Sequence, residues 1–343
     1  MAGAPRLTRP HRRGSFRSGL RRRGPPVRGQ TPLAPIANLL AAVAAEAHRF
    51  DVIHCHLDWI HLPLLQLLGV PFVTTTHGRL DLPYLQHVAR GFPEAPFVSI
   101  SNNQREPLRE LNWVATVYHG QPPQTCMASS ERGDYLAFLG RIAPEKGPEA
   151  AIRLAAAAGL PPRIAAKVPR DGSGYFRERI EPLMEGKRVE FVGEVGDKDK
   201  AEFLGKAAAL IFPIDWPEPF GLVMIEAMAC GTPTVAYRRG SVPEIIEDGV
   251  SGFVVEDETQ ALAAIAHTQD LNRHRVRAAF ERRFTARRMA EDYVQVYRQL
   301  AWEQSQRRIR LMTPCSELAH AALEFVDRVR LLQRHRRLAE QRP

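Results

Sequence analysis

Short apolar runs alternate with helical patterns along this chain from about residue 50 onward, and this alternation most narrowly limits its possible folds. Most of the apolar runs are continuous, as expected for parallel strands that are covered on both faces. Repeated strand-then-helix order predicts an α/β fold built from doubly wound parallel sheets. The predicted strands cover residues 51–55, 72–76, 97–101, 114–118, 135–139, 163–168, 188–192, 208–212, 234–237 and 252–255.

The pattern divides into two units, which suits a chain of 343 residues at ~100–200 residues per domain. Residues 121–134 are polar and rich in Pro and Ser, which predicts a linker between two sheets. We therefore expect an N-terminal domain over residues 31–122 and a C-terminal domain over residues 133–287. Helical patterns between the strands cover residues 148–158, 175–184, 200–207 and 260–268.

The net charge of +9 at pH 7 belongs to the N-terminal segment rather than to a folded surface. Residues 1–30 contain nine Arg and no acidic residue, so the other 38 Lys and Arg balance the 38 Asp and Glu. This Arg-rich tail lacks the apolar residues of a core and is predicted to be disordered. A neutral body argues against specific nucleic-acid binding, whereas the tail alone could contact nucleic acid or anionic lipid.

Several features bear on localisation. The apolar stretch 33–47 is too short to cross a bilayer, which needs ~20 residues, and its spacing fits an amphipathic helix. The four cysteines are far apart, so a reducing compartment fits better than a disulfide framework. Residues 288–343 are predicted to form helices, and residues 317–338 a basic amphipathic one that packs on the body or binds an anionic membrane surface. We expect a cytoplasmic protein, in solution or at the inner face of the membrane.

The most informative stretch is residues 208–237, which reads AALIFPIDWPEPFGLVMIEAMACGTPTVAY. A strand runs into a Pro-rich loop, and a helix then starts near Phe220 and ends before a Gly-Thr-Pro stop signal. In doubly wound sheets ligands bind where strand ends meet helix N-termini, whose unpaired N–H groups favour an anion. The ligand crevice is therefore predicted at Glu218, Phe220, Gly221 and Leu222.

Charged residues in otherwise apolar surroundings add to this picture. Glu226 is the only charged residue of the helix, and a buried carboxylate is costly unless it is paired. It either forms an internal salt bridge to an Arg or binds ligand hydroxyls. A second motif, YLAFLGRIAPEKG at residues 135–147, places Arg141 and Lys146 in the turn after a strand. Two such cations could hold a diphosphate, although loop cations are often only solvated.

Three ordered segments resemble glycosyltransferase family 4, the retaining nucleotide-sugar transferases of the GT-B fold. They are FLGRIAPEKG, the Glu-x7-Glu segment EPFGLVMIE followed by AMACGTPTVA, and RRGSVPEIIEDGVSGFVV. The resemblance covers roughly residues 50–300. It implies two Rossmann-like domains facing a central cleft and a hexosyltransferase-type activity, with the nucleotide sugar held by the C-terminal domain. It also implies that the first C-terminal helix packs back toward the N-terminal domain.

The resemblance assigns roles to the charged residues of these segments. Arg141 and Lys146 match the cations that bind the donor diphosphate. Glu218 matches the glutamate that contacts the donor sugar, which makes it a catalytic candidate. Glu226 matches the glutamate that binds the ribose hydroxyls.

Three further assignments follow from the same resemblance. His77, in the segment Thr-His-Gly, resembles the N-terminal-domain histidine that faces the donor sugar, and it is the second catalytic candidate. Lys167 is expected near the nucleotide base. The backbone beside the sugar and phosphate is expected to be that of Phe220, Gly221 and Leu222.

The resemblance implies neither a general base nor a metal. In retaining enzymes of this type the leaving phosphate is thought to take the acceptor proton, so that the protein acts by electrostatic stabilisation. His54, Cys55 and His56 suggest a metal corner, but alternation along a strand is the simpler interpretation. Asp197 and Asp199 precede a helical run, where acids complement the helix dipole. We expect no metal and no cofactor besides the nucleotide-sugar donor.

One family feature has no counterpart in this sequence. The family opens with a strand and a glycine-rich loop, whereas residues 1–30 contain neither, so the N-terminal domain is expected to be truncated. Two functions remain open. The chain is either a retaining glycosyltransferase acting on an unknown acceptor, with impaired activity, or a non-catalytic nucleotide-sugar-binding protein.

Overall fold

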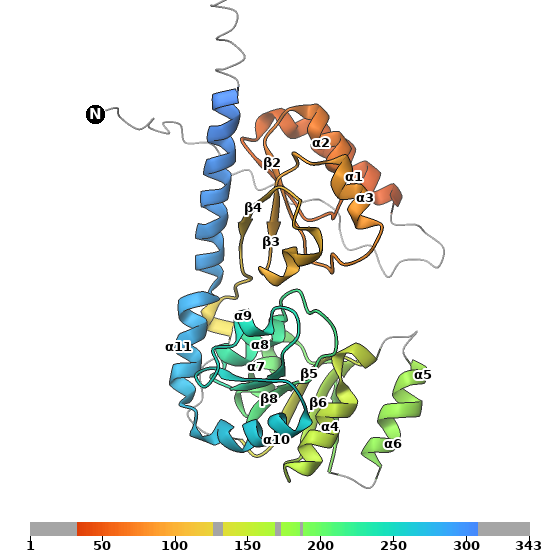
Figure 1. Cartoon of the computed structure of the whole chain (residues 1–343), viewed down its shortest axis with the longest axis vertical. Coiled ribbons are helices and arrows are strands. Elements are labelled where there is room, and N and C mark those ends of the chain that lie inside the picture. The colour runs from red at the N-terminus through yellow and green to blue at the C-terminus, as the bar shows by residue number, and fades with distance from the viewer. Residues whose placement is uncertain (1–32, 126–132, 169–172, 186–187, 308–343) are drawn as a thin grey trace, which may run out of the picture.

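The computed structural model describes residues 33–125, 133–168, 173–185 and 188–307. These residues form two α/β domains, each built around its own parallel sheet (Figure 1). The fold predicted from the strand–helix alternation is confirmed. The Arg-rich tail and the amphipathic helix predicted at residues 317–338 lie outside the described residues.

The N-terminal domain contains a four-stranded sheet in the order β1-β2-β3-β4, with every pair parallel. The described strands therefore follow chain order, without the reversal that marks a doubly wound sheet. Leu62 and Leu65 of α2 pack on one face of the sheet around Phe97. The elements are α1 (Leu33–Glu46), β1 (Ile53–Cys55), α2 (Leu62–Leu68), β2 (Phe72–Thr75), α3 (Leu85–Gly91), β3 (Phe97–Ser99), the 3-10 helix η2 (Asn103–Leu108) and β4 (Trp113–Thr116).

The C-terminal domain contains a six-stranded parallel sheet in the order β10-β9-β8-β5-β6-β7. The strand order reverses between β5 and β8, and ligands bind at such a switch point in doubly wound sheets. Each strand lies within two residues of its predicted bounds, because the ends of a continuous apolar run leave little choice for where a buried strand begins and ends. The strands are β5 (Leu136–Arg141), β6 (Pro162–Lys167), β7 (Glu190–Gly193), β8 (Ala209–Phe212), β9 (Thr234–Tyr237) and β10 (Gly252–Val255).

The helices of this domain follow the prediction less closely. The segment predicted at 175–184 contains a π-helical stretch, Phe176–Ile180, between two short α-helices. α7 begins at Asp197, earlier than predicted, because Asp197 and Asp199 occupy its first turn and complement its dipole. The helices are η4 (Pro144–Lys146), α4 (Pro148–Ala157), α5 (Ser173–Tyr175), α6 (Glu181–Met184), α7 (Asp197–Gly205), α8 (Leu222–Ala229), α9 (Val242–Ile245), α10 (Glu258–His267) and α11 (Arg273–Arg283).

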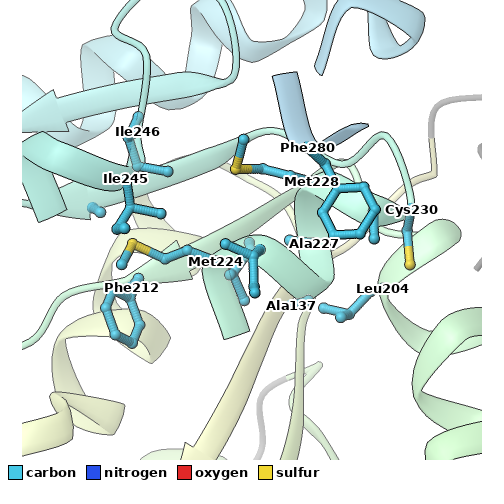
Figure 2. Close-up of a cluster of buried hydrophobic side chains, with 14 of the residues drawn as sticks. Ala137, Leu204, Phe212, Met224, Ala227, Met228, Cys230, Ile245, Ile246 and Phe280 are labelled. Carbon is cyan, nitrogen blue, oxygen red and sulfur yellow. The ribbon is translucent and has the colours of Figure 1, made fainter. Parts of the chain in front are cut away.

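α8 lies at the centre of the C-terminal core. Met224 packs with Phe212 of β8, and Met228 lies beside Phe280 of α11 (Figure 2). All four side chains are buried, so the start of α8 has little freedom to move. Cys230, directly after α8, takes part in a disulfide, which departs from the expectation of reduced cysteines, whereas Cys55 is a buried free thiol.

A helix over residues 286–307 returns from the C-terminal domain and runs along the N-terminal domain, shown in blue in Figure 1. Tyr293 lies in one core cluster with Val73 and Val98 of the N-terminal sheet. The Tyr293 hydroxyl also lies 2.9 Å from Oγ1 of Thr75. The two domains are thus joined by packed side chains as well as by the linker. Among the described residues, no helix is long and apolar enough to span a bilayer.

Candidate functional site

A cavity of about 450 Å3 lies between the two domains, at the carboxyl ends of their strands. The C-terminal domain lines it with the end of β5, with Lys146, and with the loop that leads from Glu218 into α8. The N-terminal domain lines it with His77, Ile100 and His119, which follow β2, β3 and β4. Six of the nine predicted site residues line this one cavity: His77, Lys146, Glu218, Phe220, Gly221 and Leu222.

Lys146 and Glu218 form an ion pair in this cavity. Their side chains are only 18% and 12% exposed, so the pair is screened less than a surface salt bridge. Trp216 contacts both partners. Its indole N–H donates to Glu218 Oε2 at 2.9 Å, and the Lys146 ammonium lies 4.6 Å from its ring centroid. Glu218 therefore keeps a hydrogen-bond donor even when Lys146 turns toward a ligand.

The turn that carries Lys146 is tied to the loop that carries Glu218. The backbone N–H of Asp215 donates to the carbonyl of Glu145 at 2.9 Å. Gly147 has φ of +70°, and a Cβ there would collide with the carbonyl of Pro213. Only glycine fits such a position at little cost, so the two loops can approach closely enough to pair their side chains.

The N-terminus of α8 opens onto the cavity beside Glu218. Gly221 is the N-cap, with φ of +77°, and no side chain caps the helix. The first N–H groups of an α-helix have no intrahelical partner and attract an anion. Buried Phe220 lies beneath this turn. The site thus combines a helix N-terminus, one cation and one carboxylate, which suits a ligand with both a phosphate and hydroxyl groups.

Histidines form the opposite wall of the cavity. The rings of His77 and His119 are stacked, with centroids 5.3 Å apart and planes 3° apart. The rings of His119 and Phe220 meet edge-on across the domain boundary, with their centroids 4.9 Å apart. The ring of His56 continues the stack on His77, and its Nδ1 lies 2.7 Å from Nε2 of His77. These rings follow β1, β2 and β4, so three strands of one sheet present imidazoles at the same edge.

These imidazoles are held in their neutral form. Burial, together with the neighbouring rings of His56 and His77, lowers the pKa of His54 to about 3. Burial and the same two rings lower the pKa of His119 to about 4. Burial also lowers the pKa values of His56 and His77, and Asp58 partly offsets the shift of His77. Neutral imidazoles can donate hydrogen bonds to sugar hydroxyls or accept hydrogen bonds from them, without the cost of burying a charge.

The metal corner suggested by His54, Cys55 and His56 is already occupied by contacts within the protein. His54 Nδ1 lies 2.7 Å from the Tyr297 hydroxyl, and its Nε2 lies 2.7 Å from Oγ1 of Thr75. Across the described part of the chain, no group of three or more His, Cys, Asp or Glu residues could hold a metal ion.

Three predicted site residues, Arg141, Glu226 and Lys167, do not line the cavity. Arg141, at the end of β5, is 57% exposed and donates to Glu145 Oε1 at 3.0 Å. Glu226 faces a separate cavity of about 270 Å3. There its Oε1 accepts from Lys200 Nζ at 2.9 Å and from Gln121 Nε2 at 3.2 Å. The internal salt bridge considered for Glu226 thus exists, but with a lysine rather than an arginine.

The Lys200–Glu226 pair is partly buried, with side chains 24% and 15% exposed. Burial alone would lower the pKa of Lys200, but its hydrogen bond to Glu226 raises that pKa above the usual value. Because Gln121 belongs to the interdomain linker, Glu226 fastens that linker to the C-terminal domain. Lys167 is exposed and ion-paired with Glu194 at 3.7 Å.

Two contributors to the cavity environment were missed in the sequence. His119 lies three residues after β4, and the rule that parallel strands present their carboxyl ends at one edge could have found it. Trp216 lies within the Pro-rich loop, but no periodic pattern marks the direction of a loop side chain. Its contacts with Lys146 and Glu218 are visible only in three dimensions.

Comparison with known proteins agrees with this geometry. A family model described as Glycosyl transferases group 1 matches residues 128–282. A relative from Saccharomonospora viridis, named D-inositol 3-phosphate glycosyltransferase, is 35% identical over 187 residues, 48% of this chain and 42% of the relative. One of the same name from Mycolicibacterium gilvum is 27% identical over 263 residues, 63% of this chain and 58% of the relative. The chain thus spans about half the length of the curated relatives it matches.

Solved structures share the fold. Anabaena Alr3699/HepE in complex with UDP and glucose has a TM-score of 0.63 at 20% identity, covering 78% of this chain and 83% of that chain. Sucrose-phosphate synthase from Thermosynechococcus elongatus has a TM-score of 0.65 at 22% identity, covering 80% of each chain. These neighbours have the GT-B arrangement of two Rossmann-like domains facing a cleft. The chain has this fold, as the resemblance implied.

Proposed function

We propose that this chain, whose residues 128–282 form a domain of the Glycosyl transferases group 1 family, is a glycosyltransferase that uses a nucleotide-diphosphate sugar. One observation carries the proposal. A single interdomain cavity combines Lys146, Glu218 and the N-terminus of α8 with His77 of the other domain. The relatives named as glycosyltransferases and the neighbour bound to UDP and glucose support it.

In the proposed complex the donor diphosphate lies at the N-terminus of α8 and draws Lys146 away from Glu218. The ammonium and the helix amides then stabilise the negative charge that grows on the departing diphosphate. Glu218 keeps the Trp216 N–H and turns its free oxygen toward the hydroxyls of the donor sugar. The Lys146–Glu218 pair therefore holds both side chains in the cavity until the ligand arrives.

We further propose that the sugar is transferred with retention of configuration. No described carboxylate lines the cavity besides Glu218, and burial lowers the pKa values of His77 and His119, which makes both imidazoles weak bases, so a strong general base is absent from this lining. In our proposal the leaving phosphate takes the proton of the acceptor hydroxyl on the same face of the sugar. Positioning and electrostatic stabilisation then supply the rate enhancement.

The acceptor enters from the side of the N-terminal domain in this proposal. The name of the relatives makes D-inositol 3-phosphate the first acceptor to test. UDP is the first nucleotide to test, because it is bound in the structure of a neighbour. We expect the protein to act without a metal or another cofactor. We also propose a cytoplasmic location, with contact to the inner membrane face as a second possibility.

Thermal unfolding with UDP, GDP and ADP and their glucose and mannose conjugates tests donor binding. A ligand at 100 times its dissociation constant adds ~2.7 kcal/mol of stability, which such a scan detects. Release of nucleoside diphosphate with acceptor present, and the NMR coupling of the product's anomeric proton, test transfer and retention. Stabilisation without release would favour the non-catalytic binding protein. No stabilisation by any of these compounds would contradict the proposed donor cavity.

A further inference from the structure

Glu244 of α9 reaches across the domain boundary and holds the N-terminal domain by three hydrogen bonds. Its Oε2 accepts from the backbone N–H of Asn102 at 2.7 Å, and its Oε1 from that of Asn103 at 2.6 Å. The Tyr118 hydroxyl donates to Oε2 at 2.9 Å. Glu244 belongs to the segment RRGSVPEIIEDGVSGFVV, and no step of the proposed reaction uses it.

The two amides that Glu244 binds begin η2. The first N–H groups of a helix have no partner within the helix, and Asn102 supplies no side-chain cap here. The Gln104 N–H finds Ser101 Oγ at 3.1 Å inside the N-terminal domain. For Asn102 and Asn103 the acceptor comes from the other domain. A carboxylate is well suited to this place, because charge-assisted hydrogen bonds are about twice as strong as neutral ones.

η2 in turn fixes the backbone on both sides of His77. Gln104, which is 4% exposed, donates from Nε2 to the carbonyls of Thr76 at 3.2 Å and Gly78 at 2.9 Å. Its Oε1 accepts from the Ile100 N–H at 2.9 Å. A shift of η2 would therefore move the turn that presents His77 to the cavity.

Tyr118 provides a second route to the same ring. It directly precedes His119, whose ring is stacked on His77. Burial, followed by the negative charge of Glu244, raises the pKa of Tyr118 to about 12. The Tyr118 hydroxyl thus stays a neutral donor at pH 7.

Glu244 itself is anchored next to Glu218. The N–H of Ser241 donates to the carbonyl of Glu218 at 2.9 Å. Arg283 of α11 donates to the backbone carbonyl of Glu244, and to that of Ile245 at 3.1 Å. Glu244, whose carboxylate supports the turn of His77, is therefore three residues from Ser241, whose amide binds the carbonyl of Glu218.

We infer that Glu244 is a positioning residue that sets His77 opposite Glu218 by capping η2 from the other domain. Neither its hydrogen bonds nor its place in the fold depends on the proposed transferase activity. Only the kinetic consequence rests on that proposal: loss of the cap should lower kcat more than it changes the donor KM, because the donor-binding groups Lys146 and Glu218 remain in place.

Hydrogen exchange of the Asn102 and Asn103 amides, measured by mass spectrometry with fragmentation, tests the cap in the full chain. Glu244→Gln removes the charge and one acceptor, so we expect exchange on the order of tenfold faster or more at these two amides. Glu247→Gln is the matched control, because Glu247 lies two residues after α9 and pairs with Arg282 at 3.0 Å and with Arg283 at 3.6 Å, both within the C-terminal domain. It should leave both amides unchanged.

Tyr118→Phe removes one hydroxyl and keeps the ring, so it tests the contact even where Glu244→Gln folds poorly. We expect a smaller acceleration, and in the double variant less than the product of the two single effects. Unchanged exchange in both Glu244→Gln and Tyr118→Phe, or equal acceleration in Glu247→Gln, overturns the inference. If no nucleotide sugar binds the parent, the proposed function fails while the exchange result still decides the cap.

Discussion

The backbone of Gly240 lies directly against that of Glu218, so that a Cβ on Gly240 would collide with the nitrogen and carbonyl oxygen of Glu218. Gly240 also has φ of +55°, a conformation that L-residues with side chains rarely adopt. The turn after β9 therefore supports the candidate site, because its backbone fixes the position of the loop that carries Glu218.

Gly240→Ala should impair the site more than it impairs the fold. The strained φ alone costs about 1–2 kcal/mol of unfolding free energy, and the collision additionally displaces Glu218. Gly249→Ala is the control, since Gly249 has φ of +71° but open space around its Cβ. We expect both variants to lose stability in chemical denaturation, Gly240→Ala the more, but donor binding or transfer to weaken only in Gly240→Ala. Equal functional effects would contradict the role of the collision.

Lys146→Ala should weaken nucleoside diphosphate binding by about tenfold or more, and Arg141→Ala by much less. Lys146 lines the cavity, whereas Arg141 is exposed and paired with Glu145. Isothermal titration calorimetry with UDP measures both, and Lys206→Ala, at an exposed lysine paired with Glu202, serves as a surface control. A larger loss for Arg141→Ala would mean that ligand binding rearranges the end of β5.

Glu226→Ala should lower the free energy of unfolding by about 1–3 kcal/mol, because it leaves Lys200 and Gln121 without their shared acceptor. A double-mutant cycle with Lys200→Ala in urea should give a coupling of about 0.5–1 kcal/mol. UDP affinity measured on the same variants separates the two interpretations of Glu226. A loss of affinity beyond that of Lys200→Ala would support ribose binding, and an unchanged affinity would leave Glu226 as an anchor of the linker.

The free energy of unfolding should fall as the pH drops from about 6.5 toward 4, because of the buried histidines that line the cavity. Burial holds the pKa of folded His119 near 4, below its usual 6.5, so the unfolded chain takes up protons first. Protons bound preferentially by the unfolded state lower the free energy of unfolding as pH falls through this window. Urea denaturation at about pH 7.5 and about pH 5.5 measures the slope. His119→Gln should reduce it, and an unchanged slope would show that His119 carries no such linkage.

The fold could be predicted largely from the sequence. Most strands of the C-terminal sheet are short apolar runs between turn residues, as expected for parallel strands covered on both faces, whereas the edge strand β7 is partly exposed. The helix predicted at 175–184 was harder, because three structural types divide it and their bounds depend on packing rather than on period. The family resemblance is confirmed by the match over residues 128–282.

The candidate site could be predicted in part. Glu218, Phe220, Gly221 and Leu222 lie at one helix start, and the switch-point rule places that start at the crevice. Whether a side chain at a strand end faces the cavity depends on its partners, and Glu145 holds Arg141 at the surface instead. The interdomain cap by Glu244 could not be predicted, because it joins residues 142 positions apart.

The N-terminal domain can complete its core only after the ribosome has made the helix over residues 286–307. Tyr293 covers the valines of the N-terminal sheet, yet it follows its partner Thr75 by 218 residues. At ~5–20 residues per second, the ribosome needs roughly 10–45 s to make that stretch. Until then the valine face is open to other nascent chains and to chaperones. The domain that is translated first is therefore the one that must wait longest to complete its core.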